Sequence, residues 1–159
     1  MTGSRDASSA VRRPRLSQAV CLVLGLVFTT VGVLGLVEGG FDGMGNVPAS
    51  VSGATVNGLG GSPFLNLAHL TFGLLAIGAS VTDRGPRLVA VVGLVALTAT
   101  IAYDVVALAV GSEGEPLSLE WPALVLHVVG WSLALSILVL AYRAAIRNGR
   151  EPNLSLTNW

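Results

Sequence analysis

The sequence has no lysine, a single cysteine and few charged residues. Of its 159 residues only 11% are charged, against the roughly 25% that is typical of soluble domains. Without lysine no Schiff-base chemistry is available. The single cysteine, Cys21, excludes an intramolecular disulfide and any paired-cysteine metal site. The sequence also contains no phosphate-binding glycine loop and no nucleophile elbow, so the signatures of common enzyme classes are missing.

Long apolar runs take the place of charge, and hydrophobic residues make up 52% of the chain. Four runs are each long enough to cross a hydrocarbon core about 30 Å thick, which takes roughly 17 to 25 helical residues. They are residues 19–37, 64–81, 88–110 and 122–142. None shows the alternation of a barrel strand, and a helix satisfies its own backbone in lipid. We therefore predict an all-α, integral membrane bundle of four antiparallel helices.

The charges are strongly segregated along the chain. The nine basic residues, all arginine, lie before the first run, between the second and third runs, and after the fourth. They are Arg5, Arg12, Arg13, Arg15, Arg84, Arg87, Arg143, Arg147 and Arg150. By the positive-inside rule these three segments are cytoplasmic. Both termini are then inside, and the expected location is the bacterial plasma (inner) membrane, crossed several times.

This topology divides the chain into one membrane domain and two tails. Residues 16–142 form the domain, which includes a long glycine-rich outer loop over residues 38–63. Residues 1–15 are polar and rich in serine and arginine, which predicts a disordered basic cytoplasmic tail. Residues 143–159 form a second cytoplasmic tail. The arginines lie in short clusters beside the membrane, so topology explains them and no nucleic-acid partner is expected.

Small residues recur at steps of three or four along the runs, as expected where helices pack in lipid through close backbone approach. In the second, third and fourth runs this face includes Gly73, Gly93 and Gly130, which we predict at helix contacts. Asp104 lies on the small-residue face of its run, which predicts that its carboxylate points into the bundle and away from lipid.

Three ionisable side chains share one depth in the predicted bundle. His69 and His127 each lie five residues inside the outer end of their runs, and Asp104 lies six residues inside the outer end of the third. At 1.5 Å per residue all three are ~7 to 9 Å below the outer boundary of the apolar zone. Asn66 lies one turn closer to the outside on the face of His69. These four residues form the candidate polar layer.

Several functions fit such a layer. The first is structural, because Asp104 can accept hydrogen bonds from the histidines or from Asn66 and fix the helix register. Alternatively, His69, His127 and Asp104 could bind iron, zinc or copper, or the two histidines could be axial ligands of a haem. A proton relay near the outer face is the remaining alternative. We favour the structural role, with no cofactor.

The segment "NLAHLTFG" resembles a family of small bacterial membrane proteins, common in actinobacteria, known as domain of unknown function family 4383. The family has four spanning helices and an Asn-x-x-His-Leu-x-x-Gly motif that opens the second, and Asn66, His69, Leu70 and Gly73 match this motif. His127 matches a second histidine that opens the family's fourth helix. The resemblance covers about residues 16–142 and implies the fold and the membrane location, but no activity.

We therefore interpret the sequence as that of a small, non-enzymatic protein of the bacterial inner membrane. Its polar layer would organise the bundle or an interface with a partner. The lipid bilayer is the expected surrounding, and another membrane protein or a second copy of this chain is the expected kind of partner.

Overall fold

The computed structural model describes residues 15–39, 62–110 and 121–147, and these residues form four α-helices. The helices are α1 (Leu16–Gly39), α2 (Pro63–Ser80), α3 (Gly85–Val110) and α4 (Trp121–Arg147). The predicted N-terminal tail, most of the glycine-rich loop and the last part of the C-terminal tail lie outside the described residues. Each helix is long and apolar enough to cross a membrane, so the predicted fold class is confirmed.

The helices extend beyond most of the apolar runs that predicted them, because helical geometry does not stop where the apolar residues do. α1 begins at Leu16 rather than residue 19, and α4 continues to Arg147 rather than ending at residue 142. α2 is the shortest, with 18 residues. At 1.5 Å per residue it is about 27 Å long, close to the thickness of a hydrocarbon core.

Local hydrogen bonds define both ends of α2. Ser62 is the N-cap, and its Oγ accepts a hydrogen bond from the backbone N–H of Leu65 at 3.4 Å. Pro63 follows at the first helical position, where a missing N–H is harmless. After α2 the Thr82 hydroxyl donates to the carbonyl of Ala79 at 3.0 Å and accepts from the N–H of Gly85 at 2.9 Å. This tight turn leads directly into α3.

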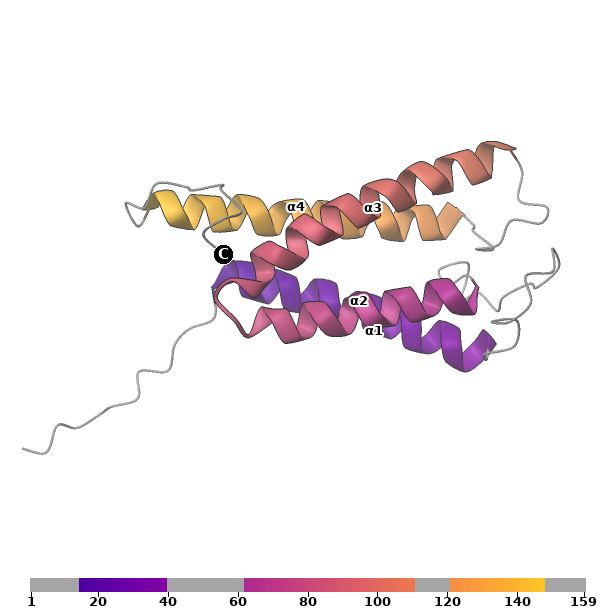
Figure 1. Ribbon diagram of the computed structural model, residues 1–159, viewed down its shortest axis with the longest axis horizontal. Helices are drawn as coiled ribbons and strands as arrows, with labels where there is room; N and C mark the ends of the chain where they lie inside the picture. Colours follow the sequence, from indigo (N-terminus) through magenta and orange to yellow (C-terminus); the bar gives the residue numbers. More distant parts are fainter. Residues whose placement is uncertain (1–14, 40–61, 111–120, 148–159) are drawn as a thin grey trace, which may run out of the picture.

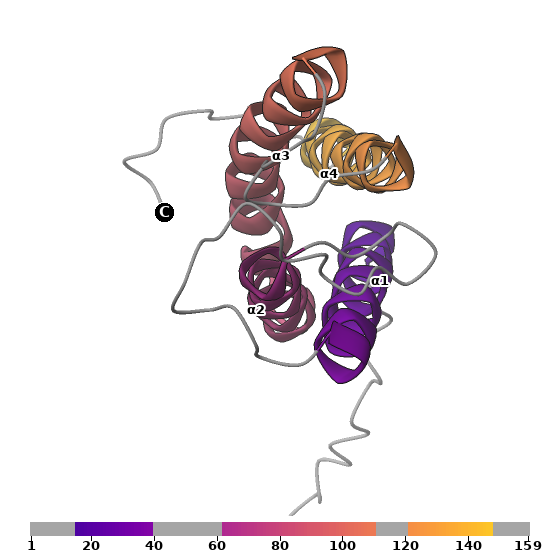
Figure 2. The same ribbon diagram turned by 90° about the vertical axis from the view of Figure 1, so that its right-hand side faces the viewer.

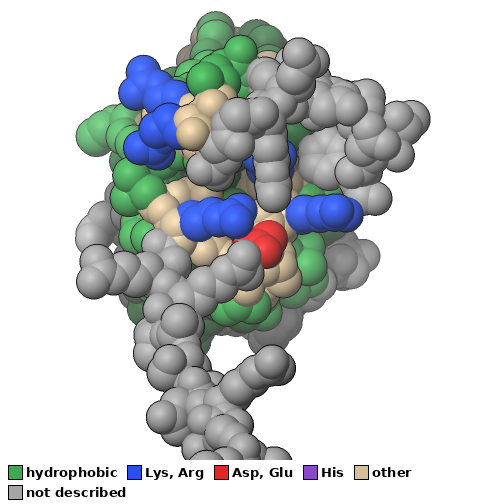
Figure 3. All heavy atoms as spheres, turned by 90° about the vertical axis from the view of Figure 1, so that its left-hand side faces the viewer, with side chains coloured by type: hydrophobic (Ala, Val, Ile, Leu, Met, Phe, Trp, Pro, Cys, Tyr) green, Lys and Arg blue, Asp and Glu red, His purple; other side chains and the backbone are tan. Residues whose placement is uncertain are grey.

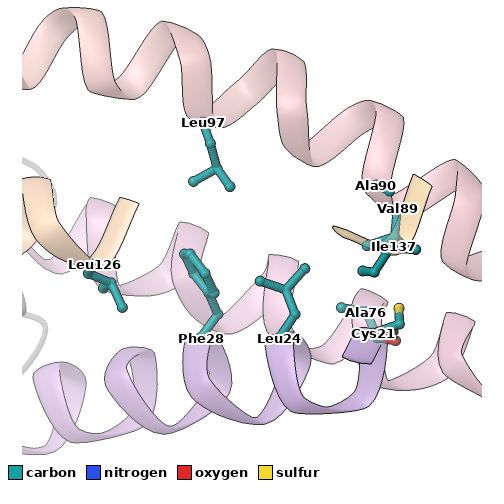
Figure 4. Packing of buried hydrophobic residues seen from close by; sticks show 9 residues of the cluster. All are labelled: Cys21, Leu24, Phe28, Ala76, Val89, Ala90, Leu97, Leu126 and Ile137. Carbon is teal, nitrogen blue, oxygen red and sulfur yellow. Dashed lines mark hydrogen bonds between the residues drawn. The ribbon is translucent and has the colours of Figure 1, made fainter. Parts of the chain in front are cut away.

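The four helices run side by side in chain order around the bundle. Figure 1 shows α1 and α2 as one layer and α3 with α4 as the other. Viewed along the bundle, α2 lies beside α3 and α1 beside α4 (Figure 2). Figure 4 shows buried side chains from all four helices that point into the common interior, among them Leu24 and Phe28 of α1 and Leu97 of α3.

All the arginines that the structure describes lie at one end of the bundle, which we call the arginine end. They are Arg15, Arg84, Arg87, Arg143 and Arg147. Figure 3 looks onto this end and shows the blue side chains spread over it, with a red acidic side chain among them. Arg15 forms an ion pair with Asp83 at 3.9 Å, and Arg87 donates a hydrogen bond to the Ala141 carbonyl at 3.3 Å. The opposite end is called the far end below.

Glycines allow α1 and α2 to approach each other most closely. A Cβ added to Gly73 of α2 would meet the backbone N and the hydroxyl of Thr29 in α1, and one added to Gly25 would lie 2.8 Å from the Gly73 carbonyl oxygen. Gly32 is equally close to the backbone of α2, where an added Cβ would lie 2.5 Å from the nitrogen of Leu70. The backbones of these two helices are therefore in direct contact.

Gly93 and Gly130, the other predicted packing positions, also lie at helix contacts. A Cβ on Gly93 of α3 would be 3.0 Å from the Phe72 ring of α2, and one on Gly130 of α4 would be 2.7 Å from the Phe28 ring of α1. Aromatic side chains of one helix pair thus fill the space that glycines leave on the other.

We expect Gly73→Ala to destabilise the protein by about 1 to 3 kcal/mol, because the added methyl group forces α1 away from α2. The matched control is Gly78→Ala in the same helix, where nothing lies within 4 Å of an added Cβ. This control should be neutral or slightly stabilising, since alanine is the better helix former. Thermal unfolding in detergent measures both. Equal stability of the two variants would contradict the close approach of α1 and α2.

Candidate functional site

Two histidines and an aspartate are buried together between three helices. Asp104 of α3 is 0% exposed, His127 of α4 is 1% exposed and His69 of α2 is 4% exposed. Each lies six residues from the far end of its helix, because α2 begins at Pro63, α4 begins at Trp121 and α3 ends at Val110. At 1.5 Å per residue the three side chains share a layer about 9 Å deep.

The three side chains form one chain of hydrogen bonds. The Nδ1 atom of His127 lies 2.6 Å from Oδ2 of Asp104. On the other side of the same ring, Nε2 of His127 lies 3.0 Å from Nε2 of His69. His127 is therefore the central member and touches both of the others, and the chain runs from α3 through α4 to α2. We call it the Asp–His–His chain.

The carboxylate determines where the protons of the chain lie. With Asp104 ionised, its carboxylate can only accept hydrogen bonds, so Nδ1 of His127 then carries a proton and donates it to Asp104. In the neutral ring Nε2 of His127 is then an acceptor, which requires that Nε2–H of His69 donates to it. This leaves Nδ1 of His69 without a proton. Asp104 in this way sets the tautomer of both rings.

Each end of the Asp–His–His chain has a polar atom that is not used. Within residues 15–39, 62–110 and 121–147, neither Nδ1 of His69 nor Oδ1 of Asp104 has a hydrogen-bond partner, although both atoms are buried. Both atoms have lone pairs that can accept a proton. Since buried polar atoms normally have partners, two open acceptors in one layer are an unusual feature of the core.

α1 supplies an aromatic wall, which the sequence analysis did not identify. The ring of Phe28 packs edge-on against His69, with centroids 5.3 Å apart and planes at 70°, and it makes a similar contact with Phe72 at 5.2 Å. Phe28 is 1% exposed. A phenylalanine within an apolar run gives no signal of its own, and only its position next to Thr29, on the small-residue face, could have indicated that it points inward.

Asn66, the fourth predicted member of the layer, lies three residues before His69 on the same buried stripe of α2 and is 1% exposed. Gly35 of α1 leaves room for it, because a Cβ at that position would overlap the Asn66 side chain. Ser62 continues the stripe to the beginning of α2 and is 9% exposed. Polar side chains thus lead from the far end to His69.

The arrangement also bears on the predicted ligands. In the parts of the chain that the structure describes, no group of three or more His, Cys, Asp or Glu side chains has a geometry that could hold a metal ion. Asp104 is bonded to Nδ1 of His127, on the other side of the ring from Nε2, so its carboxylate does not converge with the two Nε2 atoms. An iron atom between two imidazoles would hold their Nε2 atoms roughly 4 Å apart, by analogy with metal–nitrogen bonds near 2 Å. Here these atoms are 3.0 Å apart and in direct contact.

Comparison with known proteins places the chain in a family. Residues 18–142 match the family described as Domain of unknown function (DUF4383). These residues cover α2 and α3 completely, α1 from Gln18 and α4 as far as Tyr142, and they include every member of the candidate polar layer. No curated protein matches the chain, and no solved structure matches it.

We predict that the two histidines have different tautomers. In nitrogen NMR spectra of histidine-labelled protein, His127 should carry its proton on Nδ1 and His69 on Nε2, since the carboxylate imposes this order. The sequence contains only these two histidines, so the spectrum is simple to assign. In Asp104→Ala, His127 should no longer be held in the tautomer that carries its proton on Nδ1. Two Nε2 tautomers in the wild type would contradict the Asp–His–His chain.

Proposed function

Since the chain belongs to the family described as Domain of unknown function (DUF4383), whose description assigns no activity, we propose a function from the buried site. The protein acts as a non-enzymatic four-helix unit of the bacterial inner membrane. Its Asp–His–His chain holds α2, α3 and α4 in one register near the outer face. The observation that supports this role is that one ring, His127, is bonded to side chains of two other helices.

The physical argument starts from the surroundings of the helices. Large apolar side chains on their outer faces, such as Leu75, Val95 and Val106, are exposed and contact the lipid. Because lipid is as apolar as these side chains, hiding them from it gains little, and helices associate through close packing and hydrogen bonds. A buried carboxylate is costly unless it has a partner. The bundle is therefore held in an arrangement that gives Oδ2 of Asp104 a hydrogen-bond donor.

The charge distribution supports the proposed orientation. With the arginine end in the cytoplasm the chain obeys the positive-inside rule, and both termini are inside. The far end then faces the outside, and the Asp–His–His chain lies in the outer half of the membrane. The same end carries the long connection between α1 and α2, where a partner protein or a second copy of this chain would be met.

We expect Asp104→Ala to lower the free energy of unfolding by about 1 to 3 kcal/mol, because the N–H of His127 loses its buried acceptor. Asp104→Asn should retain most of the stability, since its amide oxygen can still accept that hydrogen bond. Thermal or denaturant unfolding of the reconstituted protein measures the three forms.

Thr98→Val is the matched control for this series. It removes the acceptor of the Trp131 Nε1–H, a 3.0 Å hydrogen bond between the same two helices on their exposed side. It should cost only about 0.6 kcal/mol, the average for such pairs. If Asp104→Ala proved no more harmful than Thr98→Val, the structural role of the chain would be lost.

The proposed role also predicts the metal content of the purified protein. Protein prepared in mild detergent without chelator or histidine tag should contain only trace iron, zinc or copper by elemental mass spectrometry, also after metal is added back. The reason is that both Nε2 atoms are engaged with each other and Asp104 is turned away from them. Stoichiometric metal that disappears in both His69→Ala and His127→Ala would establish the metal-binding alternative instead.

A further inference from the structure

We propose that the Asp–His–His chain binds one proton, which reaches it from the outer side of the membrane through Nδ1 of His69. The inference rests on the hydrogen-bonded chain proposed above. It adds the proton as the ligand, Nδ1 of His69 as its entry point and the outer side of the membrane as its source. Three observations carry it. Both ends of the chain have an unused acceptor, protonated and unprotonated ring nitrogens alternate along the chain, and the layer has different surroundings on its two sides.

The unused acceptors identify where a proton enters. Nδ1 of His69 is buried and has no hydrogen-bond partner in the described part of the chain, so its lone pair is open. It is also the only ring nitrogen of the two histidines that has no partner, because the other three are all engaged within the Asp–His–His chain. A proton that arrives at the chain by way of α2 therefore has one nitrogen to bind.

The transfer balances without any further reactant. The incoming proton forms a bond to Nδ1 of His69, and the Nε2–H bond of His69 breaks as its proton moves 3.0 Å to Nε2 of His127. His127 then holds protons on both nitrogens, and its Nδ1 proton lies in the 2.6 Å hydrogen bond to Asp104. The net result is one bound proton, with His69 converted from the Nε2 to the Nδ1 tautomer.

The charge of the layer favours this uptake. In the proposed starting state Asp104 is ionised and both rings are neutral, so the layer carries a single negative charge among buried side chains. After the uptake, the layer is neutral as a whole. His69 of α2, Asp104 of α3 and His127 of α4 are the acidic and imidazole groups that meet here, and Phe28, the described residue of α1 whose ring packs against His69, cannot titrate. Removing a net charge from a low-dielectric interior is favourable.

The layer differs in its distance from the two ends of the bundle and in the side chains that lie on the way to each. Toward the far end, Ser62, Asn66 and His69 form a polar stripe along α2, beside a small apolar cluster made of Leu65 of α2, Ala107 of α3 and Ala123 of α4. The distance from the layer to the far end is about 9 Å. A proton can follow the stripe along this short path.

Toward the arginine end the path is longer and apolar. Most of the main cluster of buried residues occupies this part of the bundle, with members from every helix: Cys21, Leu24, Ala76, Val89, Ala90, Leu97 and Ile137. Between the layer and Ser80 the polar groups buried among the described residues are the Thr29 hydroxyl and the Cys21 thiol, and the thiol donates to the Ala76 carbonyl at 3.3 Å. The distance along α2 from His69 to Ser80 is about 17 Å, roughly twice the distance to the far end. This side therefore offers a proton a longer path with fewer polar side chains than the stripe toward the far end.

The first test follows the tautomer of His69 with pH. Reconstituted, histidine-labelled protein is titrated from about pH 8 to pH 5, the range in which imidazole changes charge. Nitrogen NMR should show His69 converting from the Nε2 to the Nδ1 tautomer while His127 gains a second proton. In Asp104→Asn, which keeps the hydrogen bond but removes the negative charge, this conversion should be lost over the same range. A purely structural chain would not produce the switch.

The outcomes separate this inference from the proposed structural role. If the wild type folds with different tautomers at neutral pH but His69 does not convert on acidification, proton binding is refuted and the structural role stands. If the tautomers are the same at neutral pH and Asp104→Ala is as stable as wild type, both proposals fail. Conversion that persists in Asp104→Asn would also overturn the inference, because the carboxylate would then not be needed.

The second test addresses the side of entry. Asn66→Leu, which keeps the size of the side chain but removes its polar atoms, should slow exchange of the imidazole N–H protons with water roughly tenfold. Ser62→Val provides a second block of the same stripe if Asn66→Leu does not fold. The matched control is Ser80→Ala, at the arginine end of the same buried stripe, and it should leave the exchange rate unchanged. Slower exchange in Ser80→Ala alone would show entry from the cytoplasmic side and overturn the proposal.

Proton flux into liposomes completes the test. Because the inner path is apolar, wild-type protein should add no flux to that of protein-free liposomes. A protein-dependent flux that Asp104→Asn removes would show a path through the whole membrane and would refute a one-sided site.

Discussion

The hydrogen bond between Asp104 and His127 is the interaction on which the rest of the interior depends. A carboxylate in the apolar part of a membrane protein must find a donor within the protein, since lipid offers none. The 2.6 Å contact provides that donor, and it also orients the imidazole so that its other nitrogen points at His69. A single buried charge thus sets the relative position of α3 and α4, the tautomer of His127 and, through that ring, the position of α2.

α1 is held by a different kind of contact, and the two kinds complement each other. It contributes no ionisable side chain to the layer among its described residues, and its contact with α2 depends on the absence of side chains at Gly25, Gly32 and Gly73. The close approach of these backbones brings Phe28 against the edge of His69. The ring then shields the layer from the rest of the core. Van der Waals packing on one side and hydrogen bonding on the other, the two sources of helix association in lipid, therefore meet at His69.

The sequence was sufficient for the helices and for the depth of the polar layer, and the physical reason is the same for both. The length of an apolar run and the rise of a helix can be read from each segment by itself. Four membrane-spanning helices and a common depth for His69, Asp104 and His127 therefore follow without knowing how the helices pack. Equal depth does not reveal contact, however. That His127 is central, and that the two Nε2 atoms face each other, depends on the rotation of each helix about its axis, which only packing against the other helices determines.

The same reasoning explains why Phe28 was missed and why the metal and haem alternatives stayed open until the geometry was known. Small-residue periodicity marks where backbones approach, but an aromatic residue beside that face can point inward or into lipid. Likewise, two histidines and a carboxylate at one depth fit several donor sets, and these differ only in which atoms converge. The structure resolves this at the level of atoms, because Asp104 bonds to Nδ1 of His127, the nitrogen that faces away from His69.

The position of the layer within the membrane gives the chain its asymmetry. A hydrogen-bonded chain that lay midway between two apolar cores would face equal barriers on both sides, and its protonation would carry no information about either compartment. Here the layer lies about 9 Å from the far end, with Ser62 and Asn66 beside it, and about 17 Å along α2 from Ser80 at the arginine end. Since the cost of bringing a charge into the membrane rises with the depth of apolar material around it, exchange with the nearer side dominates. A negative charge that is buried close to one face, and can be neutralised only from that face, will reflect the acidity on that side alone.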